Sequence, residues 1–154
     1  MSDVQIRAAG PADLDAVLAF WKSAAEGTSI SDDSDGVARL VARDPEALLL
    51  AVRVPPAGTE PGTPGADEEL VGTVIAGFDG WRCSLYRLAV LPERRRQGIA
   101  TALLAAAERR FTALGGRRAD AMVLEANEPA HHAWAAAGYH REDQWRRWVR
   151  PLEA

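Results

Sequence analysis

Cysteine is nearly absent from this chain of 154 residues, which contains only Cys83. A single thiol cannot form an internal disulfide, and this usage suits a reducing compartment. No apolar run reaches the length of a membrane span, and the N-terminal sequence MSDVQIRAAG has no signal core. The sequence therefore predicts a soluble, cytoplasmic protein that does not enter a membrane.

A surplus of positive charge is also lacking. There are 18 basic and 22 acidic side chains, giving a net charge of −4. A nucleic-acid partner is not expected, because a phosphate backbone requires a basic face. The nucleotide-binding pattern G-x-x-x-x-G-K-[ST] is missing as well. His131 and His132 are neighbours on a predicted helix and point in different directions, so we expect no metal site.

Hydrophobic residues, by contrast, make up 47% of the chain, enough to bury one core, and we expect a single domain over residues 1–154. Alternating or continuous apolar runs predict strands, and apolar residues three or four apart predict helices. The predicted strands are 4–8, 47–54, 69–78, 82–91 and 119–125, with one or two more within 139–150; the predicted helices are 11–27, 35–43, 99–114 and 129–137.

The order of these elements predicts an α/β fold with a mixed, mostly antiparallel twisted sheet flanked by helices. The three consecutive strands within 47–91 should form an antiparallel meander. The strand–helix–strand unit over 85–125 requires a parallel pair and a right-handed crossover. Residues 55–68, PPAGTEPGTPGADE, are rich in proline and glycine. We interpret them as a flexible loop between neighbouring strands, with an active-site lid as the alternative.

The most informative stretch is LAVLPERRRQGIAT, residues 88–101. Three arginines precede a predicted helix N-terminus, where the helix dipole favours acids. No Ser, Thr, Asp or Asn stands there to accept the free N–H groups of the first turn. Spare donors, a glycine and positive charge together suit a bound phosphate. The alternative is a solvated charged turn.

This stretch resembles motif A of the GNAT N-acetyltransferase superfamily, whose pattern is Q/R-x-x-G-x-G/A. The matching residues are Arg95 to Ala100, RRQGIA, after a strand that ends in LAVLP. A second match begins at Asn127 and reads N-x-x-A-x-x-x-W-x-x-x-G-Y, where the family commonly has N-x-x-A-x-x-x-Y-x-x-x-G-F. The order of elements is also similar, so the resemblance covers essentially the whole chain.

The resemblance implies acetyl-CoA as the acyl donor, without a metal. It implies a gap between the strand ending near Val90 and the parallel strand ending near Leu124, into which the pantetheine arm fits. The implied cofactor-binding residues are Leu88, Ala89, Val90, Arg95, Arg96, Gln97, Gly98, Ile99, Ala100, Thr101, Asn127 and Ala130. Asn127 is alternatively a cap for the helix at Pro129. Arg94 is a further candidate for contact with the nucleotide phosphates.

The chain departs from the family pattern at the frequent general acid, a tyrosine, because Trp134 stands there. An indole N–H can donate a hydrogen bond but does not usefully release its proton. Trp134 is therefore a candidate for stabilising the sulfur or for core packing. Tyr139 has a proton to give, but it stands at the position of a structural aromatic residue.

Other candidates for the acceptor side are less specific. Glu125 and Asp79 are possible bases, each with a solvated carboxylate as the alternative. Tyr86 would line the acceptor side if the strand alternates regularly. Trp21 and the acidic loop Asp32–Asp35 belong to the two-helix region that covers the acceptor cleft in the family, and acid there would suit a cationic amine.

The expected function is transfer of an acetyl group from acetyl-CoA directly to a primary amine of a small molecule or a peptide. One alternative is a non-catalytic or regulatory acyl-CoA-binding module, suggested by Trp134. Another is transfer of a different acyl group, or transfer to a hydroxyl. The sequence does not identify the acceptor, and a homodimer is possible.

Overall fold

The fold is built on a five-stranded sheet whose spatial order follows the chain. The computed structural model describes residues 3–25, 27 and 29–152. Its elements are β1 (Val4–Ala8), η1 (Pro11–Asp13), α1 (Leu14–Ala24), α2 (Ser34–Arg43), β2 (Leu48–Arg53), β3 (Glu69–Phe78), β4 (Cys83–Val90), η2 (Pro92–Arg94), α3 (Ile99–Ala113), β5 (Ala119–Ala121) and α4 (Glu128–Ala136). Up to α4, the predicted order of strands and helices is confirmed.

The sheet is mixed, as predicted. Strands β1 to β4 are antiparallel neighbours, and β2, β3 and β4 form the expected meander. Strand β5 is parallel to β4, with Cys83 opposite Ala119 and Leu85 opposite Ala121. The connection from β4 to β5 runs through α3, as a parallel pair requires.

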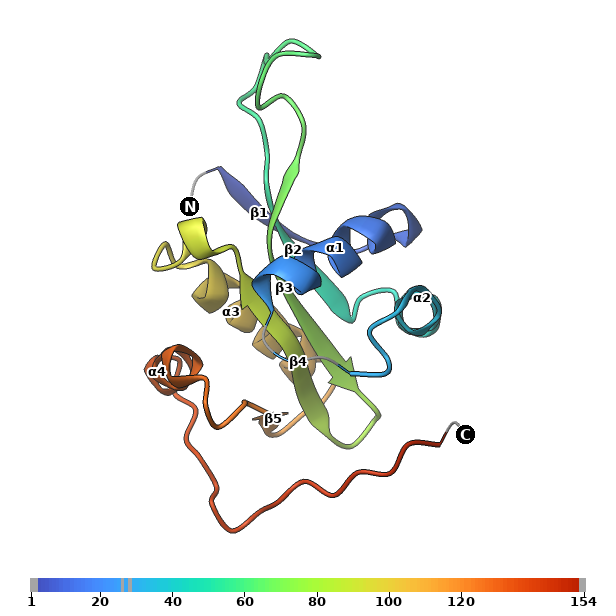
Figure 1. Cartoon of the computed structure of the whole chain (residues 1–154), viewed down its shortest axis with the longest axis vertical. Helices are drawn as coiled ribbons and strands as arrows, with labels where there is room; N and C mark the ends of the chain where they lie inside the picture. The colour runs from blue at the N-terminus through green and yellow to red at the C-terminus, as the bar shows by residue number, and fades with distance from the viewer. Residues whose placement is uncertain (1–2, 26, 28, 153–154) are drawn as a thin grey trace.

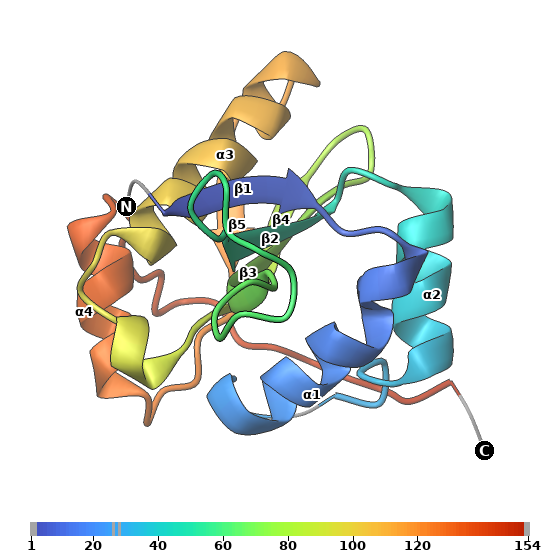
Figure 2. The same cartoon turned by 90° about the horizontal axis from the view of Figure 1, so that it is seen from above.

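Two apolar layers lie on opposite faces of this sheet. Helix α3 covers one face, while α1 and α2 cover the other (Figure 2). The periodic apolar residues of the helices fill both layers. On the α3 side these are Ile99, Leu103, Leu104, Ala107 and Phe111; on the other side they are Val17, Phe20, Trp21, Val37 and Val41.

A close approach at Gly72 fixes α3 against β3. A Cβ at this position would lie 3.0 Å from both Ile99 Cγ2 and Leu103 Cδ1. The absence of a side chain therefore lets the first turns of α3 pack directly on the strand backbone. This contact holds the N-terminus of α3 beside the end of β4.

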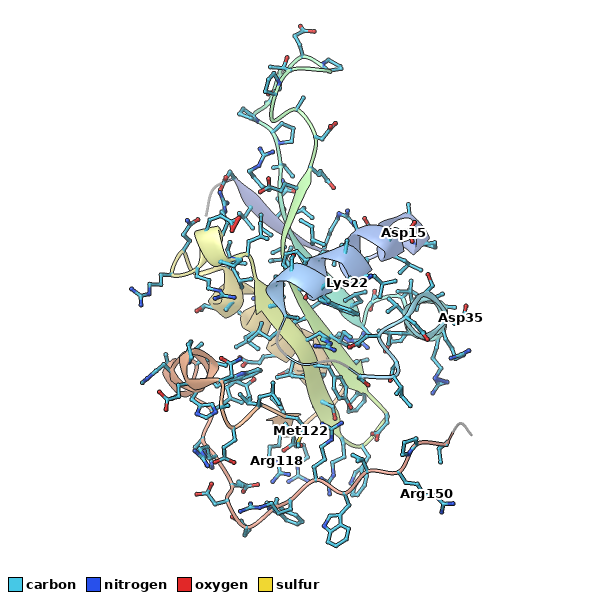
Figure 3. The ribbon with its side chains drawn as sticks, in the orientation of Figure 1. Asp15, Lys22, Asp35, Arg118, Met122 and Arg150 are labelled. Carbon is cyan, nitrogen blue, oxygen red and sulfur yellow. The ribbon has the colours of Figure 1, made fainter. Side chains whose placement is uncertain are left out.

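Two strand predictions in the C-terminal third are wrong. The strand expected over residues 119–125 is only three residues long, and the described chain over 139–150 contains no strand. Met122 and Leu124 lie past the end of β5, and both are exposed. Figure 3 shows Met122 next to the lower part of β4 and Arg150 on the irregular chain that passes below it. Apolar composition alone did not create strand pairing there.

The loop over residues 55–68 extends well beyond the sheet (Figure 1). The guanidinium of Arg53 donates to the carbonyl of Asp67 at 3.1 Å, at the base of the loop. The loop does connect neighbouring antiparallel strands, as predicted. Among the described residues, no helix combines the length and the apolar character that a membrane crossing needs.

Candidate functional site

The turn between β4 and α3 has the backbone of an anion site. Gly98 is the N-cap of α3 at φ 82°, and Arg96 has a φ of 64°. The first helical bond is donated by Ala102 N to Gly98 O at 3.0 Å. The N–H groups of the residues before Ala102 therefore have no carbonyl within the helix, and glycine offers no side-chain acceptor. These donors, at the positive end of the helix dipole, can bind a phosphate.

The three arginines of this turn have different surroundings. Arg94 is bound to Asp3, with N–O distances of 3.2 and 3.3 Å, and holds the pKa of that carboxyl below its usual value. Arg95 Nε donates to the carbonyl of Val90 at 3.3 Å. Arg96 is exposed. Contact of Arg94 with the phosphates stays a prediction, and its guanidinium is paired here with the N-terminal segment.

A gap in the strand pairing begins beside β4, where the parallel pairing with β5 ends. In the described chain, β5 pairs with Cys83–Leu85 only, whereas β4 continues to Val90. Ala89 and Val90 are paired with β3 on one side, and the chain after Ala121 does not continue the sheet on the other. Free backbone groups along a strand edge can bind an extended, amide-containing ligand.

A bulge in β4 changes which side chains lie on each face of the sheet. Thr73 lies opposite Ala89 and Ile75 lies opposite Tyr86, so β4 has an extra residue. Arg87 has a φ of 54° at this point. Leu85 and Leu88 consequently both pack on the α3 side of the sheet. The expectation that Tyr86 shares a face with Leu88 and Val90 is corrected; Tyr86 is 52% exposed.

The second motif forms the start of α4. Asn127 Oδ1 accepts a hydrogen bond from Ala130 N at 3.3 Å, so this residue caps the helix. Trp134 is partly buried, and its ring meets the edge of Tyr139 with centroids 5.0 Å apart. The hydroxyl of Tyr139 donates to Glu108 Oε2 at 2.7 Å.

These contacts bear on proton transfer. Burial, reinforced by the neighbouring carboxylate of Glu108, raises the pKa of Tyr139 above its usual range. A phenol with a raised pKa, already bound to a carboxylate, is a poor proton donor to a leaving sulfur. Tyr139 and Trp134 form a packed aromatic pair against the α3 core.

Three candidates for the acceptor side are held by other contacts. Asp79 accepts from the backbone N–H groups of Trp81 and Arg82 at 2.8 and 2.6 Å, and these bonds lower its pKa. Glu125 pairs with Arg141 at 2.9 Å and is exposed. Trp21, expected as a substrate contact, is only 6% exposed, so this expectation is corrected. Among the described residues, no cluster of His, Cys, Asp and Glu suits a metal ion.

Sequence reasoning missed two residues of this region, Arg87 and Thr73. Thr73 is completely buried, and its hydroxyl donates to the carbonyl of Arg87 at 2.8 Å. A threonine in a strand with continuous apolar neighbours gives no signal of such a role. The arginine in the strand sequence CSLYRLAV is a charged residue among mostly apolar ones. The pattern of apolar and polar residues does not show that the backbone bulges there.

Known proteins resemble this chain in sequence and in fold. Residues 42–139 match the family model described as the Acetyltransferase (GNAT) family, which covers more than half of the chain. The chain belongs to the GNAT acetyltransferase family. An acetyltransferase of Pectobacterium atrosepticum is 30% identical to this GNAT protein over 125 residues, which are 81% of this chain and 79% of that protein.

Solved structures show the same fold at low sequence identity. An aminoglycoside 6'-N-acetyltransferase from Acinetobacter baumannii has a TM-score of 0.70 and 18% identity, covering 97% of this chain and 99% of its own. The PaiA N-acetyltransferase of Thermoplasma acidophilum, solved in complex with coenzyme A, has a TM-score of 0.67 and 16% identity, covering 91% of each chain. This GNAT protein is therefore an acetyltransferase by family, and it has its fold in common with these two N-acetyltransferases.

Proposed function

We propose that this GNAT enzyme transfers an acetyl group from acetyl-CoA directly to a primary amine of a small molecule or a peptide. The observation that carries the proposal is the uncapped N-terminus of α3 beside a strand edge that β5 leaves open. The first feature suits the pyrophosphate of coenzyme A and the second suits the amides of its pantetheine arm. The thioester supplies an activated acetyl group.

Different segments of the chain would bind different parts of coenzyme A. Backbone N–H groups of Arg96, Gln97, Gly98, Ala100 and Thr101 would hold the pyrophosphate. The backbone of Leu88 and Val90 would pair with the pantetheine. Ala130, small and partly buried at the start of α4, would leave room for the cofactor to pass.

Direct transfer is favoured over an acyl-enzyme. Cys83 is 1% exposed within the core, so its thiol cannot reach an acyl donor. The neutral amine would form the new C–N bond to the acetyl carbon as the C–S bond breaks. The sulfur leaves with the electron pair, and the amine nitrogen loses one proton to a base or to water. Glu125 and Asp79 are the candidates for that base.

Thiol release from acetyl-CoA tests this proposal. The purified protein is incubated with acetyl-CoA and one amine in each reaction. The amines are spermidine, lysine, kanamycin A and a peptide with a free N-terminal alanine. The expected result is coenzyme A release above the hydrolysis background with at least one amine, and a product that is heavier by one acetyl group.

Two results would refute the proposed acetyl transfer. Tight binding of acetyl-CoA by calorimetry, with no release for any amine, would instead favour a regulatory acyl-CoA-binding module. Faster turnover with propionyl-CoA than with acetyl-CoA would reassign the acyl group.

A further inference from the structure

The bulge of β4 places a charged side chain at an unusual backbone position. Arg87 has a φ of 54°, in a region that glycine occupies without strain and other residues rarely adopt. It stands at the point where the β3–β4 register shifts. A residue other than glycine adopts this conformation only where surrounding interactions hold it. Hydrogen bonds hold both the backbone and the guanidinium of Arg87.

The backbone of Arg87 is held by a buried chain of hydrogen bonds. Its carbonyl accepts from Thr73 Oγ1 at 2.8 Å. The same oxygen of Thr73 accepts from Trp21 Nε1 at 2.9 Å. Because Trp21 belongs to α1, this chain connects the bulge through β3 to the helix that precedes the α1–α2 loop, residues 25–33.

The guanidinium of Arg87 binds the α1–α2 loop itself. Nε donates to Asp32 Oδ1 at 3.3 Å, and Nη2 pairs with the other carboxylate oxygen of Asp32. Nη1 donates to the carbonyl of Gly27 at 3.0 Å. The guanidinium carbon lies 5.6 Å from the centre of the Trp21 ring. With its side chain 13% exposed, this ion pair is screened by solvent less than a surface pair is.

The same loop reaches the far side of the gap. A Cβ at Gly27 would lie 3.3 Å from Leu124 Cδ1, on the segment that follows β5. The loop thus contacts β4 through Arg87 and approaches the diverging segment through Gly27. Gly27 therefore spans the opening between β4 and the segment after β5, with Arg87 on one side and Leu124 on the other.

We infer that Arg87 is a positioning residue that fixes the α1–α2 loop across this opening through Asp32, and thereby sets the affinity for the amine acceptor. The inference rests on the proposed acetyl transfer, because it assigns the loop side of the gap to the acceptor. The pair lies away from the turn at Gly98, and its loss leaves the backbone of Leu88 and Val90 in β4, so coenzyme A binding should not depend on it. Arg87→Gly would keep the bulge but remove the contacts that hold the α1–α2 loop.

Arg87→Gly separates these two roles, since glycine tolerates the backbone conformation and the whole side chain, guanidinium included, is removed. Asp32→Asn removes the charge of the partner from the loop side with little change in shape. The matched control is Arg7→Gly, which deletes the two-bonded Arg7–Asp13 pair on β1, the strand at the other edge of the sheet. Each variant is compared with wild type by steady-state kinetics, calorimetry with coenzyme A and hydrogen exchange.

Arg87→Gly and Asp32→Asn should each raise the KM for the amine that gave the fastest coenzyme A release by about tenfold, since partners of one ion pair are lost in either case. The double variant should be no worse than the single ones. Backbone hydrogen exchange in residues 25–33 of the free protein should quicken, while the Kd for coenzyme A stays within twofold. Arg7→Gly should change none of these.

An unchanged acceptor KM in both variants, or a loss of coenzyme A affinity, would overturn the positioning role. Unchanged exchange in the α1–α2 loop would do so as well. If Arg87→Gly fails to fold, Asp32→Asn carries the same test from the loop side. A wild-type protein that releases no coenzyme A with any amine would refute the proposed function and the acceptor role together, a result distinct from active wild type with unaffected variants.

Discussion

Glutamate at Gly98 should abolish coenzyme A binding without unfolding the protein. Gly98 is the left-handed N-cap of α3, so any other residue there is strained by about 1–2 kcal/mol. A carboxylate at a helix N-terminus returns about 0.3–1 kcal/mol through the dipole. The net loss of about 1 kcal/mol is small against a typical stability of about 5–15 kcal/mol, so Gly98→Glu should remain folded.

The effect on binding should be much larger. Two unit charges of the same sign about 4 Å apart repel each other by about 4 kcal/mol at an effective dielectric constant of about 20. The side chain of Gly98→Glu would introduce such a charge where the pyrophosphate is expected. At about 1.4 kcal/mol for each factor of ten, the Kd for coenzyme A should rise about a thousandfold.

Gly115 provides the matched control at the other end of α3. It also has a positive φ, 93°, and a Cβ there would meet nothing within 4 Å. Gly115→Glu should therefore lose at least as much stability, measured by urea unfolding, and keep its coenzyme A affinity, measured by calorimetry. A folded Gly98→Glu protein that bound coenzyme A like wild type would refute the phosphate assignment.

Three further substitutions test particular contacts. Tyr139→Phe should lower the free energy of unfolding by about 1 kcal/mol and leave kcat within twofold, because the phenol is bound to a carboxylate of α3; a hundredfold fall in kcat would instead identify a proton donor. Arg7 lowers the pKa of Asp13 below 3.8, so the pair stabilises the fold above that pH and its contribution is lost as the pH falls through the lowered pKa. Asp13→Asn should thus reduce the urea midpoint at neutral pH, and its difference from wild type should shrink below pH 3.8. A difference that stayed the same below this pH would contradict the pairing. Gly72→Ala should destabilise by about 1–3 kcal/mol through overpacking against α3, whereas Gly77→Ala, whose Cβ would have its nearest neighbour at 3.6 Å, should unfold near the wild-type midpoint.

Local patterns predicted the elements whose structure is decided locally. The run over residues 69–78 predicted β3 with its exact bounds, because its apolar residues are bounded by a loop and a turn. The turn before α3 was predicted from the missing cap and the glycine, both of which are properties of a few consecutive residues. The structure adds a positive φ at Arg96 to that of Gly98.

Features that depend on pairing across the fold were not predictable in the same way. The sequence ADAMVLE is apolar enough for a longer strand, yet β5 ends at Ala121. Whether an edge strand continues depends on the direction of its neighbour, which the strand's own residues do not encode. The position of Arg94 was also missed, since Asp3 is distant in sequence and only the folded chain brings the two together.

The candidate site thus arises from two interruptions of regular pairing, the end of β5 at Ala121 and the bulge at Arg87. The first leaves the backbone groups to which we assign the donor, and the second binds the loop that we assign to the acceptor. The indole N–H of Trp134 does not usefully release its proton, and the hydroxyl of Tyr139 is bound to Glu108. Neither aromatic residue is therefore suited to protonating the sulfur. A thiolate with a pKa of about 8.5 can leave without that help. Under the proposed reaction, the protein therefore assists mainly by delivering a neutral, oriented amine, which is why the contact between Arg87 and Asp32 should matter more to the rate at low acceptor concentration than either aromatic residue does.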